Sequence, residues 1–403
     1  MKNWILSLLV FGGVAHTVVA QSDTFKLMQY NLLMYPESNP AKAVHLNTIL
    51  NYLNPDIISL NELTSSAAID SIYSVVDTTK YQFGPLYADG LISNALMYNK
   101  QKLGIATSFG FQTSPRKTSI FKLYNKQQNF ALYPDTIYIT VGVVHFKSSQ
   151  GSSNENVRLI QAIDITDYIR VFEPSNFLLA GDYNMYTSNE PAYQELLTPA
   201  EKYLVDPINR PGNWNNNSSF ADIHTQSPRT ISFDGGVTGG LDDRFDIVLV
   251  LNEIMEGTGG LRYLPGTYQA PGNDGNHFNT SILANPQNTS APQEIIEALH
   301  AMSDHLPVVM ELEMDPSNVS TSSKVIAPIG GCCYNVLQTI STDKDLSWQV
   351  YASGGNLIAQ SNETEFNKLE LNPGLYFLKI GEPECDCVFK MLVRTDAEIL
   401  FSR

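Results

Sequence analysis

The sequence predicts an α/β domain followed by a small all-β module. Between Phe25 and Met314, short apolar runs of strand character alternate with segments whose apolar residues have helical spacing. This interleaving is typical of a domain in which helices cover β-sheets. Beyond Asp315 the pattern changes to short strands separated by turn residues, which is typical of a small β-sandwich.

The elements of the α/β domain follow from local signals. A helix is expected at 41–53, where apolar residues recur at helical spacing and Asn54-Pro55 ends the pattern. A second amphipathic helix is expected at 154–172, ended by Pro174. The strands are expected where apolar runs are bounded by turn residues: 25–33, 56–63, 94–99, 136–146, 176–183, 244–250 and 306–313.

Two long segments lack any periodicity. Residues 207–243 are rich in Asn, Gly, Ser and Pro, and residues 267–281 have a similar character. Both are predicted to be loops, and loops of this length in compact domains are usually functional or mobile.

The ends of the chain differ from its middle. Residues 1–20 have the parts of a secretory signal peptide: the basic Lys2, an apolar stretch and a small-residue exit. The residue directly after the expected cleavage point is not a cysteine, which argues against a lipid anchor there. No later run is long and apolar enough to cross a bilayer. We therefore expect a secreted protein, extracellular or at the cell surface, without stable membrane insertion. The predicted organisation is a signal peptide 1–20, a main domain 21–314, a linker 315–324 and a β-sandwich 325–403.

The chain is acidic, with a formal net charge of −16 and a pI of about 4.8. A protein that binds phosphates by charge alone would be basic. A polyanionic ligand would therefore need a local cation, and a bound metal is the obvious candidate. The simpler alternative is that an acidic surface keeps an exported protein soluble.

All four cysteines lie near the C-terminus, at Cys332, Cys333, Cys385 and Cys387. In an oxidising compartment they are expected to form two disulfides, whose connectivity the sequence does not determine. A zinc site made from all four is the alternative. The adjacent pair and the single-residue spacing are not usual for zinc ligands, so disulfides are favoured.

Polar side chains recur at the tips of the predicted strands. Each alone is compatible with a turn or a structural histidine. If the strands are sheet neighbours, however, their tips converge on one cleft, and so many acids together need a divalent cation or a shared proton. Carboxylates without thiolates suit Mg²⁺, Mn²⁺ or Ca²⁺ better than zinc. The candidate site residues are Asn31, Glu62, His145, Asp182, Asn184, Asp246, Asp304 and His305.

The motifs "QYN", "PDIISLNEL", "VVHFKS", "LAGDYNMY", "DDRFDIVLV" and "SDHLPVV" occur in the order found in the endonuclease/exonuclease/phosphatase superfamily. That superfamily includes deoxyribonuclease I, apurinic endonucleases and neutral sphingomyelinases. The resemblance covers Phe25 to Met314. It implies a four-layer α/β sandwich of the deoxyribonuclease I type and metal-assisted hydrolysis of phosphate esters, with Mg²⁺, Mn²⁺ or Ca²⁺ as cofactor.

The resemblance also implies metal ligands and a general base. Glu62 resembles the principal metal ligand, Asp304 a second carboxylate beside the metal, and Asn31 an amide of the metal shell that also binds substrate. His305 resembles the imidazole that acts as general base or contacts the phosphate, and Asp246 the carboxylate that orients it. A buried carboxylate fixes the tautomer of such a ring, which makes the pair chemically sensible.

Three further roles come from the same resemblance. Asp182 resembles the acid that positions or activates the attacking water. Asn184 resembles an amide that holds the phosphoryl oxygens. His145 resembles the phosphate-contacting histidine of the deoxyribonuclease I and sphingomyelinase branches. Which histidine is acid and which is base stays open, because the pKa values of a coupled cluster belong to the group.

The sequence departs from the named nuclease subtypes at several positions. Deoxyribonucleases often carry Gln before the metal-binding Glu and an Arg shortly after it, where this chain has Asn61 and Leu63-Thr64. Apurinic endonucleases have an Asp close after the first Asn, where this chain has Leu32-Leu33. Asp89 is the candidate acidic partner for His145.

The expected function is therefore a secreted phosphodiesterase of open specificity. Extracellular nucleic acid is the expected substrate, cleaved by a monomeric endonuclease. The alternatives are a sphingomyelinase-like or other phosphoesterase and, less favoured, a non-catalytic surface binding protein.

Four other features carry weaker expectations. Arg244 is expected to pair with Asp242 or Asp243, and Arg158 to form a salt bridge inside the domain. His277 lies in a Gly/Asn-rich segment that either meets substrate or only turns. The C-terminal module resembles the sorting domains of the type IX secretion system, although the ending "RTDAEILFSR" lacks their Lys-rich finish; the secretion machinery is therefore an expected partner.

Overall fold

The computed structural model describes residues 22–128, 136–200 and 202–319, together with five C-terminal segments. The predicted signal peptide and Cys332 and Cys333 lie outside the described residues, as do the side chains of Cys385 and Cys387. The disulfides therefore stay a prediction. The C-terminal segments are 347–352, 357–361, 374–382, 385–393 and 399–402.

Two mixed six-stranded sheets form the main domain. The parallel pairs β1–β2 and β7–β8 occupy corresponding places in the two sheets, and the other pairs are antiparallel. The first sheet has the order β11 (Gly259–Tyr263), β12 (Val308–Val319), β1 (Asp23–Tyr35), β2 (Ile57–Leu63), β4 (Ser93–Asn99) and β3 (Tyr81–Phe83). The second has the order β5 (Leu103–Thr113), β6 (Arg116–Asn125), β7 (Tyr138–His145), β8 (Phe177–Asp182), β10 (Asp246–Leu251) and β9 (Leu204–Val205).

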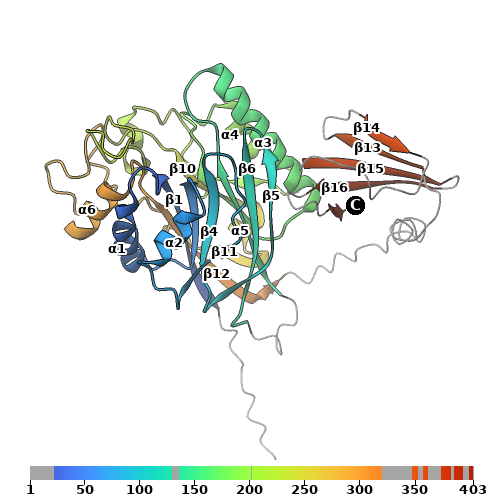
Figure 1. Cartoon of the computed structure of the whole chain (residues 1–403), viewed down its shortest axis with the longest axis horizontal. Coiled ribbons are helices and arrows are strands. Elements are labelled where there is room, and N and C mark those ends of the chain that lie inside the picture. The colour runs from blue at the N-terminus through green and yellow to red at the C-terminus, as the bar shows by residue number, and fades with distance from the viewer. Residues whose placement is uncertain are drawn as a thin grey trace, which may run out of the picture.

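Helices cover the outer face of each sheet (Figure 1). The first sheet carries α1 (Ala43–Leu53), α2 (Ala67–Tyr73) and α6 (Gln293–Met302), whose apolar side chains share one core with it. The second carries α3 (Ser152–Phe172) and α4 (Pro191–Leu196) over another core. The short elements are η1 (Pro40–Lys42), η2 (Ser218–Ile223) and α5 (Asn252–Glu256).

A central core lies between the two sheets. Both faces of strand β1 are apolar because each face packs against a different core. Phe25 and Leu27 belong to the central core, whereas Met28 and Tyr30 belong to the core under the helices. Because successive side chains point to opposite faces, a strand buried on both sides reads as one continuous apolar run. The predicted four-layer α/β sandwich is confirmed.

The same alternation makes one end of the central layer polar. In β1, the face that carries Leu27 continues with Gln29 and then Asn31, all fully buried. In β8, the face that carries Leu178 ends at Asp182. The apolar core thus gives way to amides and carboxylates where the first residues of β10 and the last residues of β1, β2, β7 and β8 meet. This end of the sandwich holds the candidate site.

The structure differs from the sequence prediction in several elements. Strand β12 continues to Val319, past the predicted start of the linker at Asp315. The hairpin β5–β6 and helix α6 were not predicted. The hairpin mixes Gly, Ser and Thr into its strands, which weakens the apolar pattern. Helix α6 has clear helical spacing, but it was missed because the Pro- and Asn-rich segment before it has the character of a loop.

The described C-terminal strands form one antiparallel sheet, and the predicted β-sandwich over 325–403 stays a prediction. Its order is β14 (Leu357–Ser361), β13 (Ser347–Ala352), β15 (Gly374–Glu382), β16 (Cys385–Val393) and β17 (Ile399–Ser402). Among the described residues, no helix has the length and apolar character needed to cross a membrane.

Candidate functional site

Asp182 lies at the centre of the polar end of the sandwich. It ends β8, and its direct cross-strand neighbours are His145 on β7 and Asp246 on β10. His145 Nε2 lies 3.4 Å from Asp182 Oδ2 and 3.8 Å from Glu62 Oε1. Sheet register alone therefore brings an acid, an imidazole and a second acid together, as the strand-tip argument predicted.

Glu62 reaches the site from the other sheet because the backbone turns at its position. Asn61 faces the central layer, so regular alternation would point Glu62 away from it. Instead Glu62 has φ of 63°, in the left-handed region, at a register irregularity of β2. Its Oε2 accepts a hydrogen bond of 2.8 Å from Met34 N, in a second segment with positive φ. Such strained backbone is common where a site dictates the geometry.

The two carboxylates and His145 make a donor set that fits a divalent cation. One ligand atom each from Glu62, His145 and Asp182 lies within 4.8 Å of the others. The two carboxylates suit Mg²⁺ or Mn²⁺, whereas a directly bound imidazole favours Mn²⁺ or another transition metal over Mg²⁺. Of the described residues, only these three form such a group of His, Cys, Asp or Glu.

Two other predicted metal ligands take different positions. Asn31 Nδ2 donates to Glu62 Oε1 at 3.1 Å and to Asp182 Oδ2 at 3.0 Å, while its Oδ1 accepts from Leu33 N. In this orientation Asn31 aligns the carboxylates. Asp304 Oδ2 accepts a hydrogen bond from Val237 N at 2.8 Å. Direct ligation by Asn31 and Asp304 stays a prediction.

Metal affinity should depend on pH through Asp182. Burial, with the neighbouring Asp246 and Glu62 carboxylates, raises the pKa of Asp182 to about 7 in the metal-free protein. A cation must displace that proton, so affinity for Mg²⁺ or Mn²⁺ should fall about tenfold for each pH unit below about 7. Calorimetric titration between pH 5 and 8 would measure this, with Asp182→Asn as the reference variant. A flat pH profile in the unmodified protein would contradict the assignment of Asp182 as a ligand.

The predicted His305–Asp246 pair is present. His305 Nδ1 lies 2.7 Å from Asp246 Oδ2, and both side chains are buried. Burial alone would lower the pKa of His305, but Asp246 and Asp182 outweigh it and raise that pKa well above its ordinary value. The other ring nitrogen, Nε2, lies 3.8 Å from Asp182 Oδ2 and 2.7 Å from the amide nitrogen of Gln226.

Asn61 ties the two sheets together behind these groups. Its Oδ1 accepts from Gln29 Nε2 and from Asp182 N, and its Nδ2 donates to Val144 O. These buried bonds fix the spacing of the sheets directly under the site. Asn184 completes the second sheet's contribution: it has φ of 51°, and its N donates to Asp182 Oδ1 at 3.0 Å.

Arg116 is a site residue that the sequence reasoning missed. It begins β6, and its Nη1 is buried with no hydrogen-bond partner among the described residues. Burial lowers its pKa, an effect that the nearby Asp182 and Glu62 carboxylates oppose. Burial, together with Arg116, in turn holds the pKa of His145 well below the ordinary value. No motif marked Arg116, because its hairpin was itself not predicted.

The remaining predicted polar residues have structural partners. Arg158 pairs with Glu190 at 2.7 Å, which confirms the expected salt bridge. Arg244 pairs with Asp206, not with Asp242 or Asp243 as predicted, through bonds of 2.8 and 3.0 Å.

His277 and Asp89 also have structural partners. His277 is only 1% exposed and contacts Asp274 and the carbonyls of Ala284 and Pro286, so it stabilises its own loop. Asp89 accepts from Lys117 N, while His145 Nδ1 is buried without a hydrogen-bond partner among the described residues. Asp89 is therefore not the hydrogen-bonded partner predicted for His145.

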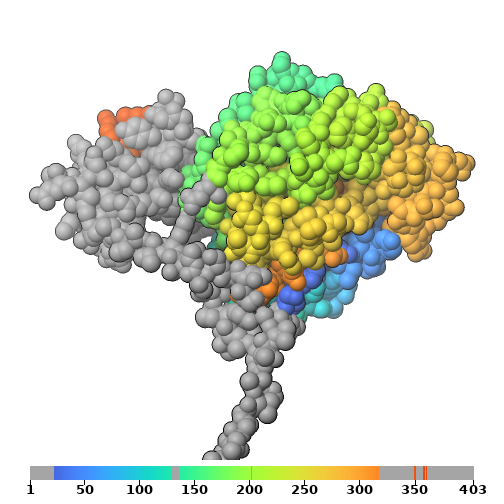
Figure 2. Space-filling model, turned by 180° about the vertical axis from the view of Figure 1, so that it is seen from behind, coloured from blue at the N-terminus to red at the C-terminus, as the bar shows by residue number. Residues whose placement is uncertain are grey.

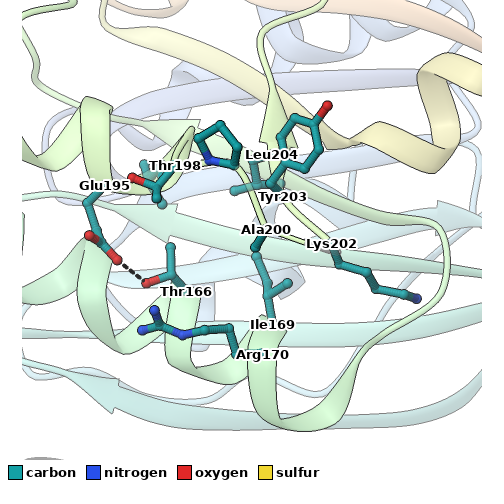
Figure 3. A pocket seen from close by; sticks show the side chains of 11 residues that line it. Thr166, Ile169, Arg170, Glu195, Thr198, Ala200, Lys202, Tyr203 and Leu204 are labelled. Carbon is teal, nitrogen blue, oxygen red and sulfur yellow. Dashed lines mark hydrogen bonds between the residues drawn. The ribbon is translucent and has the colours of Figure 1, made fainter.

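The structure also has hollows outside the cluster. One, of about 110 Å³, lies between α3 and the residues of α4 and the segment that follows it. There Thr166 donates to Glu195 (Figure 3). No predicted site residue lines it. Another, of about 230 Å³, is lined by Asp246, Tyr268 and the surface pair Arg210–Asp222. Figure 2 shows a face of the domain on which green, yellow and orange segments lie at the surface.

No protein-family model matches the sequence, and no curated protein matches it. Solved structures do resemble the fold. An endonuclease/exonuclease/phosphatase from Bacteroides vulgatus is 14% identical, with a TM-score of 0.47, over 73% of this chain and 100% of its own. D. rerio TDP2, complexed with a single strand DNA product, is 13% identical over 72% and 98%, with a TM-score of 0.48. A mannosyl-6-phosphatase from Bacteroides thetaiotaomicron is 13% identical over 72% and 99%, with a TM-score of 0.46.

Proposed function

We propose that this chain is a secreted, divalent-metal-dependent phosphodiesterase that acts on extracellular nucleic acid as an endonuclease. Three features of one site support a phosphate ester as substrate: an acidic cluster suited to a cation, a histidine held by a carboxylate, and an arginine whose buried Nη1 has no hydrogen-bond partner among the described residues. The order of the sequence motifs supports the same reaction class.

Arg116 is the observation that carries the proposal. Its buried Nη1 has no hydrogen-bond partner among the described residues, which is costly because charged groups away from water need a counter-ion or full hydrogen bonding. The carboxylates near Arg116 are also the ones suited to a metal, so a bound cation would leave the guanidinium facing another positive charge. A ligand anion between the two would relieve that repulsion. Guanidinium groups bind phosphate oxygens particularly well.

A divalent ion held by Glu62, Asp182 and His145 would supply Lewis-acid stabilisation of phosphoryl and leaving-group charge. The side chains of the protein would supply proton transfer and phosphate binding. In its neutral form, His305, oriented by Asp246, would present an Nε2 lone pair toward Asp182, where it could take a proton from water. Arg116 and the Asn184 amide would bind non-bridging oxygens.

The test uses the protein from Gln21 to Arg403 with supercoiled plasmid, Mg²⁺ and Ca²⁺. Nicking that both EDTA and His305→Ala abolish would support a metal-dependent endonuclease with this site. An intact plasmid would overturn the DNA endonuclease proposal. Parallel incubations with RNA, sphingomyelin and nitrophenyl phosphate mono- and diesters would then show whether another phosphate ester is the substrate.

Arg116→Gln should weaken substrate binding about 10- to 100-fold. A hydrogen bond to a charged group contributes about 1.5–3 kcal/mol, which corresponds to that range of affinity. We expect KM for a phosphodiester and the inhibition constant of inorganic phosphate to rise together. Lys117→Gln is the matched control, because the Lys117 ammonium contacts the carbonyl of Ala88 instead. Equal effects of the two variants, or none from Arg116→Gln, would contradict the role of Arg116.

A further inference from the structure

Gln226 is a polar residue beside the site that no sequence motif marks. It is 8% exposed, and its amide nitrogen lies 2.7 Å from His305 Nε2. Nε2 is the ring nitrogen left free by Asp246 and the one that faces Asp182. Gln226 therefore contacts the atom on which the proposed chemistry depends.

The backbone of Gln226 is held firmly enough to position a side chain. Its N donates to Asp243 O, and its O accepts from both Asp242 N and Asp243 N. The preceding residue, Thr225, accepts from Leu306 N at 2.7 Å through its carbonyl, and its hydroxyl accepts from Asp246 N at 3.1 Å. The segment is thus bonded to the strand that carries Asp246 and to the one that follows His305.

We propose that Gln226 is a positioning residue that fixes the ring of His305 for catalysis. A ring bonded only through Nδ1 can tilt about that bond, whereas a second bond at Nε2 sets the direction of the nitrogen. The amide also suits this place because it is neutral. A carboxylate would add charge beside Asp182 and Asp246, and a lysine would compete with a metal for the same acids.

With the nitrogen of Gln226 donating to Nε2, the hydrogen bonds are internally consistent. When the ring is neutral, Nε2 accepts from Gln226, and the ring proton on Nδ1 is donated to Asp246 Oδ2. An amide also has an oxygen, so a turn of the side chain keeps the contact when Nε2 carries a proton. Neither an apolar side chain nor a carboxylate can both donate to Nε2 and accept from it.

The test variant is Gln226→Met, which keeps length and volume but removes both hydrogen-bonding groups. The proposal rests on the proposed phosphodiesterase activity. In that assay kcat should fall about 10- to 100-fold while KM changes little. Loss of a residue that orients a metal-binding side chain has an effect of similar size. Gln101→Met, at an exposed glutamine bonded to Thr79 O, is the control for the chemical change alone.

A second measurement needs no substrate. In protein labelled with ¹⁵N-histidine, the Nε2 resonance of His305, assigned by its loss in His305→Ala, should shift in Gln226→Met at constant pH and unchanged melting temperature. A shifted resonance supports the contact even if no phosphate ester is hydrolysed. An unshifted resonance overturns the proposal, as does a rise in KM alone.

Discussion

Glu62→Gln is expected to abolish metal binding and to lower kcat/KM by about 10³-fold or more. Glu62 contributes one of two carboxylates in the donor set, and a neutral amide is a much weaker ligand for a hard cation. Removing even one electrostatic stabiliser from an active site costs about 10²–10³-fold, so the loss of a metal ligand should be at least as severe. The substitution keeps the shape of the side chain and an oxygen that can accept from Met34 N.

Calorimetric titration with Mg²⁺ and Mn²⁺ measures the binding directly, separately from activity. The metal-free variant should be at least as stable to heat as the unmodified protein, because Glu62 and Asp182 repel each other without a cation. Glu297→Gln, at an exposed position of α6, is the control. Unchanged metal affinity in Glu62→Gln would show that the cation binds elsewhere, whatever happens to activity.

The positions of Asp182, His145 and Asp246 could be predicted because they depend only on strand alternation and sheet register. A polar residue that continues the alternation of an apolar strand face lies on that same face, at the end of the same core layer. Glu62 was predicted from the motif, but its approach to the site depends on a left-handed backbone conformation that alternation does not reveal. The orientation of the Asn31 amide depends on Leu33 N, a bond that only the folded turn creates.

Arg116 and Gln226 could not be predicted, for a different physical reason. Each reaches the site through tertiary contacts of a segment without a clear local pattern: an irregular hairpin for Arg116, and a long loop for Gln226. The partner of Arg244 was missed for the same reason. Sequence proximity suggested Asp242 or Asp243, whereas the buried pair is made across the fold with Asp206. Local spacing predicts faces of elements, but not which distant loops close over them.

Asp246→Asn is expected to lower kcat about 10²–10⁴-fold, the range that general acid–base catalysis contributes. The asparagine amide can donate to His305 Nδ1, which would move the ring proton to Nε2 and remove the lone pair that accepts a proton from water. Metal affinity should change little, since Asp246 is outside the donor set of Glu62, His145 and Asp182. This combination, lost turnover with retained metal, separates the base from the metal site.

The tautomer itself can be observed. In ¹⁵N-histidine spectra, the proton of the neutral His305 ring should be on Nδ1 in the unmodified protein and on Nε2 in Asp246→Asn. Asp222→Asn, at an exposed acid paired with Arg210, is the matched control and should leave both kcat and the spectrum unchanged. If Asp246→Asn moves the proton but kcat is preserved, His305 is not the base. The role of activating water would then pass to Asp182, to which the family resemblance gives that role.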